Sequence, residues 1–331
     1  FCLSRGLGDV YKRQPMKHSI RARVTGFGAK RGTEVVVYAL REGAAKGVEV
    51  SDALALFECL RRVGKARRLD LILTANGGQI SAARKIAVLL REYAKDLTVF
   101  VPYKARSAAT LLCLGADSLV MGPFGELSPF DSHILAASEP SAKTPAAISS
   151  EDIKNFSAMA KDWFGLSSTE SRTRVFEVLG SRVFPTTLTA FFRADAYLRS
   201  VAAGQLKLHL PTASPSKIHA IVNQFISGMP EHSHGFVRGD LKRMGLNVRN
   251  ASSYEEGAIW DIWRECQGDM DSAPSDAGLR KNGVILSRDY CAEFVVLMPA
   301  AAALAPEKPA TKDRDLEKYA YGRWRASYER R

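Results

Sequence analysis

Apolar and polar positions change period in a regular way between residues 34 and 123. Short apolar or β-branched runs at 34–40, 69–75, 97–102 and 118–122 are typical of buried strands. Segments with helical spacing separate them, at 51–65 and 79–95, and the short run "SAATLLCLG" follows the third strand. Strands that alternate with helices at this spacing predict parallel βα units, with helices covering the sheet.

The helical spacing also predicts which faces are buried. In segment 51–65 we expect Leu54, Phe57 and Leu60 to pack on the sheet. In segment 79–95 the same spacing selects a longer apolar face, formed by Ile80, Ala83, Ile86, Leu90 and Tyr93. Both helices are therefore predicted to be amphipathic covers of a single sheet.

The alternation of strand and helix patterns ends at residues 137–147, where Pro, Ser and Ala predict a loop. A mostly helical pattern follows, at 150–164, 168–179, 187–203, 214–228, 239–246 and 254–266. Beyond residue 270, "DSAPSDAG" is typical of a linker, and "GVILSRDYCAEFVVLMP" predicts a hairpin. We therefore expect one α/β domain over 16–270, followed by 271–331 with a linker, a hairpin and a basic aromatic tail.

The first residues differ from the rest of the chain. "FCLSRGLGDVYKRQ" has neither the apolar region nor the cleavage site of a signal peptide, and it resembles translated adapter sequence. Residues 1–15 are therefore predicted to be an adapter-derived or disordered leader before Met16. The formal net charge is +12, and about +10 remains without the leader, so the chain should attract anionic partners.

Composition predicts a soluble protein of a reducing cytoplasm. The longest apolar run, 294–305, is too short to span a bilayer and contains Pro299. The cysteines beyond the leader are widely spaced and lie in apolar patterns, which favours burial over disulfides: Cys59, Cys113, Cys266 and Cys291. His18, His209 and His219 have no metal-ligand spacing, so we expect neither a metal nor another cofactor.

The C-terminal segment "DLEKYAYGRWRASYERR" interleaves aromatic residues with arginines. Such a patch can stack on and neutralise nucleic acid. An amphipathic helix that docks on its own domain or on a neighbouring subunit fits the pattern equally well, and we favour this second interpretation.

Two strand ends carry candidate chemistry. Gly77 and Gly78 follow the strand 69–75, and Ser107 follows the strand 97–102. If these strands are adjacent and parallel, the glycine amides and the Ser107 hydroxyl meet beyond their carboxyl ends, as an oxyanion hole and a nucleophile require. The simpler alternatives are a plain glycine turn and a serine that caps the following helix.

Several ordered motifs resemble the serine dehydrogenase proteinase family, a group related to signal peptide peptidase A within the ClpP/crotonase superfamily. These motifs are the "ANGGQIS" turn, "ARSAAT" around Ser107, "GADSLVMGP", "LSPFD" and, more loosely, "HSHGFVRGDLKRMGLNV" at 232–248. The resemblance implies a ClpP/crotonase-like fold of repeated parallel βα units, with a mostly helical C-terminal half.

The resemblance also implies residue roles. Ser107 would be the nucleophile, and the amides of Gly78 and Ala108 would form the oxyanion hole. His234 would take the Ser107 proton while Asp131 orients its imidazole.

The general base is open to a second assignment. Relatives of signal peptide peptidase A use a Ser–Lys dyad, and Lys154 lies at a suitable distance downstream. The alternative for Lys154 is a solvated charge beside Glu151 and Asp152. His133, two residues beyond Asp131, is interpreted as loop decoration.

Together these features predict a cytoplasmic serine peptidase that acts on peptide or protein substrates as a homo-oligomer. Ala108 and Ala109 stand where the family has Gly-Gly, and this departure supports a second hypothesis. In that hypothesis the chain is an inactive relative that binds peptides or scaffolds a complex. Acyl-CoA chemistry on the same fold is a third candidate, and nucleic-acid binding as the main function rests only on charge and on the composition of the C-terminal segment.

Overall fold

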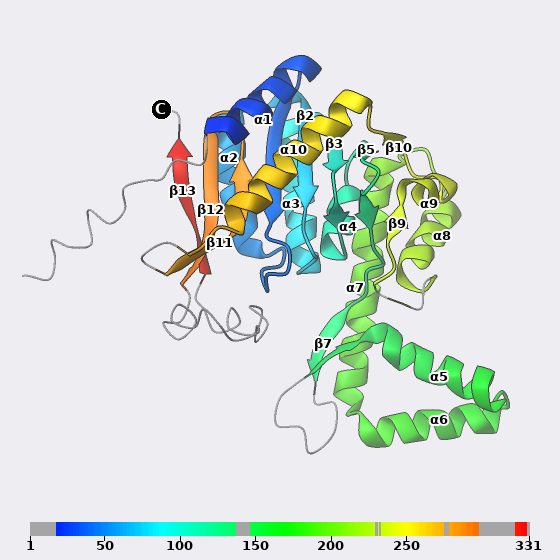
Figure 1. Ribbon diagram of the computed structural model, residues 1–331. Coiled ribbons are helices and arrows are strands. Elements are labelled where there is room, and N and C mark those ends of the chain that lie inside the picture. Colours follow the sequence, from blue (N-terminus) through cyan, green and yellow to red (C-terminus); the bar gives the residue numbers. More distant parts are fainter. Residues whose placement is uncertain are drawn as a thin grey trace, which may run out of the picture.

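An eight-stranded sheet forms the centre of the protein (Figure 1). The computed structural model describes residues 18–136, 146–228, 231, 233–274, 278–297 and 322–329. In spatial order the strands are β10 (Val248–Asn250), β5 (Ser118–Met121), β3 (Ala94–Val101), β2 (Ala66–Thr74), β1 (Glu34–Leu40), β11 (Leu279–Leu286), β12 (Tyr290–Leu297) and β13 (Gly322–Glu329). The strands from β10 to β1 are parallel, which confirms the predicted βα units.

Helices cover both faces of this sheet because side chains alternate along each strand. On β1, Val35 and Val37 belong to a core with α1 (His18–Arg31) and α10 (Ser253–Met270). Val36 and Tyr38 belong to the opposite core, with α2 (Val50–Val63), α3 (Ile80–Tyr93) and α4 (Ala108–Cys113). Figure 1 shows α1 and α10 lying side by side across one face.

The buried face of α2 differs from the prediction. Leu60 is buried, but Leu54 is 66% exposed and Phe57 is 38% exposed. The face against the sheet also uses small residues, among them Ala53 and Cys59, which allow the helix to approach closely. The expectation for α3 holds better, since Ala83, Ile86 and Leu90 are buried while Ile80 and Tyr93 pack partly buried against the same core.

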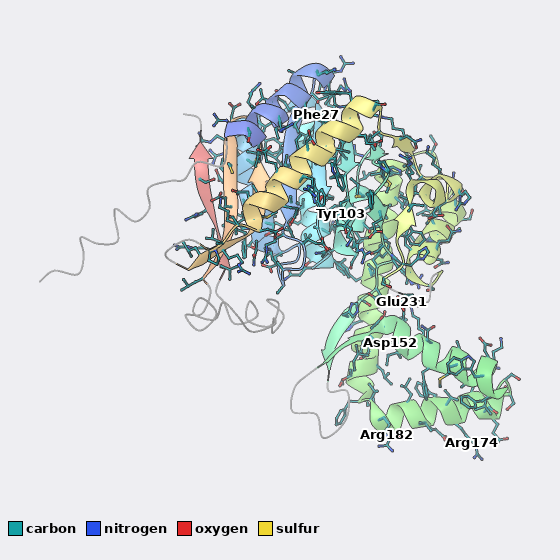
Figure 2. The ribbon with its side chains drawn as sticks, in the orientation of Figure 1. Phe27, Tyr103, Asp152, Arg174, Arg182 and Glu231 are labelled. Atoms are coloured by element: carbon teal, nitrogen blue, oxygen red, sulfur yellow. The ribbon has the colours of Figure 1, made fainter. Side chains whose placement is uncertain are left out.

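A helical arm projects from one end of the body (Figure 1). It begins with the hairpin of β7 (His133–Ala136) and β8 (Ala146–Ser149) and continues through α5 (Ser150–Phe164) and α6 (Thr169–Arg182). Figure 2 marks Asp152, Arg174 and Arg182 on this arm. The long helix α7 (Pro185–His209) returns the chain to the body, where Leu198 and Leu206 enter the main core. α6 itself buries no residue.

A small second sheet lies beyond the carboxyl ends of the parallel strands, since Ala105 also bridges to Ala75, directly after β2. It pairs β4 (Lys104–Ala105), β6 (Glu126–Leu127) and β9 (Phe236–Val237). The helices α8 (Pro215–Ile226) and α9 (Arg238–Arg243) flank β9 in the sequence. This sheet matters for function because β4 ends two residues before Ser107.

The residues after 270 complete the large sheet. β11 pairs antiparallel with β1, β12 with β11, and β13 with β12. A domain boundary at residue 270 would therefore cut through a continuous sheet. The expected tail helix is wrong for 322–329, because these residues form the strand β13. Trp324 on β13 lies opposite Phe294 on β12, and the centres of their rings are 5.5 Å apart. The predicted leader, 1–15, lies outside the described residues.

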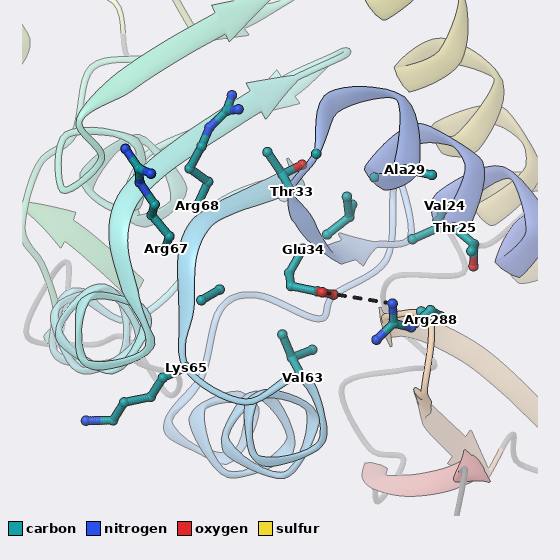
Figure 3. Close-up of a pocket in the computed structure, with 14 residues that line it drawn as sticks. Val24, Thr25, Ala29, Thr33, Glu34, Val63, Lys65, Arg67, Arg68 and Arg288 are labelled. Atoms are coloured by element: carbon teal, nitrogen blue, oxygen red, sulfur yellow. Dashed lines mark ion pairs between the residues drawn. The ribbon is translucent and has the colours of Figure 1, made fainter.

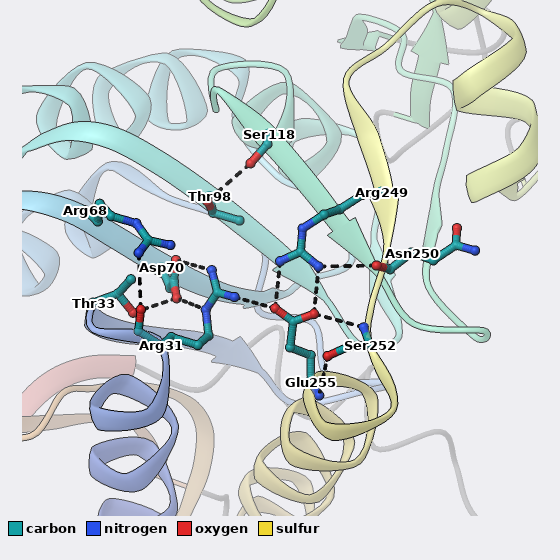
Figure 4. Close-up of polar contacts among 10 residues, drawn as sticks. All are labelled: Arg31, Thr33, Arg68, Asp70, Thr98, Ser118, Arg249, Asn250, Ser252 and Glu255. Carbon is teal, nitrogen blue, oxygen red and sulfur yellow. Dashed lines mark hydrogen bonds and ion pairs between the residues drawn. The ribbon is translucent and has the colours of Figure 1, made fainter.

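An ion-pair network around two buried carboxylates, Asp70 and Glu255, joins the sheet to the helices α1 and α10 on one of its faces (Figure 4). Arg31, at the end of α1, bonds to Asp70 on β2 and to Glu255 on α10. Arg249 on β10 binds Glu255 through two bonds of 2.6 and 2.7 Å, and Ser252 caps α10. The bonds from Arg249 lower the pKa of Glu255 to about 2. Two carboxylates, Asp70 on β2 and Glu255 on α10, thus connect these elements to α1 and β10 through Arg31 and Arg249.

Acid should remove the stability that ionised Glu255 provides. Its pKa is about 2 in the folded chain and 4.5 as a free side chain, so the contribution is present above the unfolded value and is lost as the pH falls. We expect the free energy of unfolding, from urea titrations, to fall by about 2 kcal/mol more in wild type than in Glu255→Gln between about pH 7 and about pH 3. Glu256→Gln should keep the wild-type pH dependence. Equal pH dependence in wild type and Glu255→Gln would contradict this account.

Candidate active site

Ser107 has an unusual backbone conformation. With φ 48° and ψ −116°, it is the only non-glycine residue of the described chain with positive φ. It occupies the N-cap position of α4, yet its side chain makes no capping bond, so the capping interpretation is wrong. Strain of this kind persists only where the surroundings fix it, and it is common at functional sites. The conformation resembles the sharp strand-to-helix turn that exposes a nucleophilic serine.

The surroundings hold this conformation through backbone bonds on both sides of Ser107. Arg106 donates its N–H to Ala75 O (3.0 Å), and the Ser107 N–H donates to Ser128 Oγ (2.9 Å). Thr110, one turn later, donates to Ala105 O (2.8 Å). The turn is thereby anchored to the end of β2 and to the segment that follows β6.

Gly77 and Gly78 are required by close contacts. A Cβ on Gly77 would lie 2.9 Å from Ser107 Cβ, and a Cβ on Gly78 would lie 2.3 Å from both N and O of Val48. Both residues also have positive φ, 107° and 144°. The predicted meeting of the Gly-Gly turn and Ser107 is therefore present in the structure, and only glycine fits there.

The turn leaves two N–H donors beside Ser107. Val48 donates to Gly77 O (2.6 Å) and accepts from the Gln79 N–H (2.8 Å), so in this parallel bridge the Gly78 N–H points away from Val48. Within the described residues, neither the Gly78 N–H nor the Ala108 N–H has a hydrogen-bond acceptor. Unpaired donors of this kind can bind an oxyanion.

Alanine suits the two positions after Ser107. Ala108 and Ala109 are buried at the start of α4, and neither has positive φ. The Ala109 N–H bonds to Arg106 O (2.8 Å), while the Ala108 N–H remains available. The departure from Gly-Gly therefore imposes no backbone strain on the turn.

One phenylalanine brings together the segments of Asp131 and His234. Phe225 stacks on Phe130 at 5.3 Å and meets Phe236 edge-on at 5.0 Å. Asp131 directly follows Phe130, and the His234 ring packs 4.9 Å from Phe236. Both segments thus converge on the small sheet that leads to Ser107.

In the described part of the chain, no hydrogen bond or ion pair joins Ser107, Asp131 and His234 into a triad. The Ser107 hydroxyl makes no hydrogen bond to any described residue, and Asp131 Oδ1 lies 3.2 Å from Nδ1 of His133. His133, interpreted from the sequence as decoration, is thus a partner of the candidate acid. The sequence shows His133 two residues after Asp131, but this spacing alone does not predict a contact between the two side chains.

Lys154 lies in an ion-pair network on the arm. Its Nζ is 2.8 Å from Glu151 Oε1 and 2.7 Å from Asp195 Oδ1, and its side chain is 43% exposed. These contacts agree with the interpretation of Lys154 as a solvated charge on an amphipathic helix. α5 is nevertheless tied to the Asp131 segment, because Ser132 Oγ donates to Ser150 Oγ at 2.8 Å.

Sequence reasoning missed two residues of this site, Gly47 and Ser128. A Cβ on Gly47 would lie 3.0 Å from Gly77 O and 3.1 Å from Gly78 Cα, so a third glycine permits the packing of the turn. Ser128 accepts the Ser107 N–H. The signal for Gly47 was a glycine before the β-branched Val48, which is too common to indicate a site. Ser128 lies in the "LSPFD" motif, but the resemblance assigned a role only to Asp131.

A cavity of about 740 Å³ lies at the other end of the parallel strands from Ser107 (Figure 3). It opens at the amino ends of β1 and β2, whereas Gly77 and Ser107 lie beyond the carboxyl ends. Its cations are Lys65, Arg67, Arg68 and Arg288. The carbonyl ends of α1 and α2 point to this same end of the parallel strands, and cations commonly balance such helix ends. This cavity is separate from the Ser107 turn.

Residues 20–159 match the family described as ClpP-like SDH-type serine proteinase. The resemblance found in the sequence is confirmed. Together with the parallel βα units, the match assigns the ClpP-like α/β fold, and the matched family is one of serine proteinases. The matched range contains Ser107, both turn glycines, Asp131 and Lys154, but not His234.

Two curated relatives, both from Methanocaldococcus jannaschii, match parts of the chain. The uncharacterized protein MJ1495 is 26% identical over 136 residues, which cover 38% of this chain and 47% of that protein. The uncharacterized protein MJ0137 is 32% identical over 89 residues, covering 27% and 31%. The chain thus spans about half the length of the first relative and about a third of the second.

Two similar solved structures are mutants of the 1510-N membrane-bound stomatin-specific protease. A lysine-to-alanine mutant in complex with a substrate peptide has a TM-score of 0.39 and 14% identity, covering 67% of this chain and 78% of that one. A serine-to-alanine mutant has a TM-score of 0.38 and 14% identity, covering 66% and 80%. At these values the likeness assigns no residue of this chain.

Two further features concern the part of the chain that the structure describes. None of its helices is long and apolar enough to cross a membrane. It also contains no group of three or more His, Cys, Asp or Glu side chains placed to hold a metal ion.

Replacing Ser107 by glycine should stabilise the fold relative to alanine. Glycine adopts positive φ without strain, whereas alanine keeps the cost of the turn. We expect Ser107→Gly to exceed Ser107→Ala by about 1 kcal/mol in the free energy of unfolding, measured by urea titration. At Ser181, an exposed site within α6, the order should reverse by about 1 kcal/mol. The same order at both sites would argue against strain at Ser107.

Proposed function

We propose that this protein hydrolyses peptide bonds through an acyl-enzyme on Ser107. The observation that carries the proposal is the Ser107 turn, which combines a serine at positive φ, whose hydroxyl has no partner among the described residues, with two unpaired N–H donors, those of Gly78 and Ala108. An acyl-transfer site needs this combination of nucleophile and oxyanion donors. The match of residues 20–159 to a serine proteinase family supports the same reaction class.

In the proposed reaction, Ser107 Oγ attacks the carbonyl carbon of the scissile bond and passes its proton to a general base. The carbonyl oxygen becomes an oxyanion, which accepts the N–H groups of Gly78 and Ala108. Collapse of this intermediate breaks the C–N bond, and the base returns the proton to the leaving amine. Water then attacks the ester, the base takes its proton, and the acid product leaves as Ser107 regains its hydrogen.

We assign the base to His234, oriented by Asp131. The shared packing on Phe225 supports this pairing, as does the position of His234 two residues before β9 of the small sheet. The ion pairs of Lys154 with Glu151 and Asp195 favour a structural role for this lysine, which remains the alternative base. His133 enters the test because it contacts Asp131.

We further propose peptide or protein substrates, a homo-oligomer and a cytoplasmic site of action. The four described cysteines are buried and form no disulfide with one another, which fits a reducing compartment. Nucleic-acid binding through the C-terminal segment is less favoured, because Trp324 donates to Asp52 and packs on Phe294 in place of stacking on a ligand.

Fluorophosphonate labelling followed by intact-mass analysis tests the proposal. Wild type should gain one phosphonyl group at Ser107, and Ser107→Ala should gain none. His234→Gln should slow labelling at least about 100-fold, since a general base contributes roughly 10² to 10⁴. Lys154→Met and His133→Gln should label at close to the wild-type rate.

Three outcomes separate the candidates. Loss of labelling in Lys154→Met but not in His234→Gln would transfer the base role to Lys154. No labelling of folded wild-type protein would overturn the peptidase proposal. Peptide binding that then survives Ser107→Ala would favour the inactive binding protein, to which the Ala108–Ala109 departure first pointed.

A further inference from the structure

A fully buried acid, Asp52, gathers donors from three parts of the fold. Its Oδ2 accepts the Tyr38 hydroxyl (2.5 Å) and the Glu49 N–H (2.8 Å), and Lys46 Nζ lies 2.8 Å from Oδ1. Trp324 Nε1, on β13, also donates to Oδ1 (2.7 Å). Burial and the charge of Asp52 raise the pKa of Tyr38 well above its usual value, so its hydroxyl remains a donor.

The ion pair continues directly into the oxyanion turn. The Lys46 side chain, only 2% exposed, also donates to Gly47 O (2.7 Å). Gly47 packs on the backbone of Gly77 and Gly78, and Val48 donates to Gly77 O. Three consecutive residues thus connect the buried pair to the backbone that presents the Gly78 N–H.

The C-terminal strand reaches the same cluster from 272 residues away in the sequence. β13 pairs with β12 at the edge of the large sheet. The Trp324 ring packs on Phe294, and Lys46 Nζ lies 4.7 Å from the centre of the Phe294 ring. One indole therefore contacts both the acid and the aromatic surface that supports the lysine.

The type of contact indicates positioning more than stability. A buried ion pair is weak evidence for stability, because apolar side chains of similar volume often stabilise a core equally well. Unlike apolar packing, a buried ion pair fixes the orientation of the groups that it joins, because its hydrogen bonds are directional. We propose that the Lys46–Asp52 pair, anchored by Trp324, positions the Gly77–Gly78 turn, so that the C-terminal strand sets the geometry of the oxyanion hole. This inference rests on the function proposed above.

The test uses Trp324→Phe, which keeps a ring on Phe294 and removes only the Nε1–H donor and indole bulk. At saturating fluorophosphonate we expect the rate constant for labelling Ser107 to fall about tenfold, because small displacements of oxyanion donors are costly. The half-saturating concentration and the final labelled fraction should be unchanged. A loosened fold would instead lower the labelled fraction. Trp163→Phe, at a site 78% exposed on α5, is the matched control and should behave as wild type.

Hydrogen exchange supplies a readout that needs no activity. The Gln79 N–H, bonded to Val48 O, should exchange about tenfold faster in Trp324→Phe than in wild type, since weaker support opens the turn more often. Tyr38→Phe, which removes another donor to Asp52, should change both readouts in the same direction.

The two proposals fail in different ways. If wild type is labelled and the Trp324 and Tyr38 variants keep its rate constant and its exchange at Gln79, the positioning inference is overturned. If wild type is not labelled, the peptidase proposal is overturned, and exchange at Gln79 alone decides whether the C-terminal strand supports the turn.

Discussion

The central constraint is the close approach of backbone segments around Ser107. Gly47, Gly77 and Gly78 pack where a Cβ would meet neighbouring backbone or the Ser107 side chain at about 3 Å or less. Because these glycines carry no side chain, the end of β2, the loop after β1 and the start of α4 can come into direct backbone contact. The positive φ of Ser107 and the unpaired N–H of Gly78 both occur within this packing.

The rest of the fold maintains this approach. The parallel order of β1, β2 and β3 places successive strand ends side by side, and the buried Lys46–Asp52 pair supports the loop between β1 and α2. On the opposite face, the network of Arg31 and Glu255 ties α1 and α10 to the sheet. The site is thus built on rigid elements, as preorganised chemistry requires.

Features that are local in sequence were predictable. The strands that surround the site, the Gly-Gly turn and the meeting with Ser107 follow from apolar runs and from parallel topology. Features that depend on distant partners were not. The sequence around Trp324 could not reveal that its indole bonds to Asp52, and residues 322–329 form a strand because β12 offers an unpaired edge. Similarly, the buried face of α2 depends on how closely its alanines approach the sheet.

The central claim is that Gly78 and Ala108 form an oxyanion hole for Ser107. A crystal structure of the phosphonylated protein tests it most directly, because the phosphonyl oxygen occupies the place of the oxyanion. The account predicts this oxygen within about 3 Å of both backbone nitrogens, with the Ser107 turn unchanged. An adduct whose oxygen points to solvent, or whose phosphorus is bonded to another residue, would contradict it.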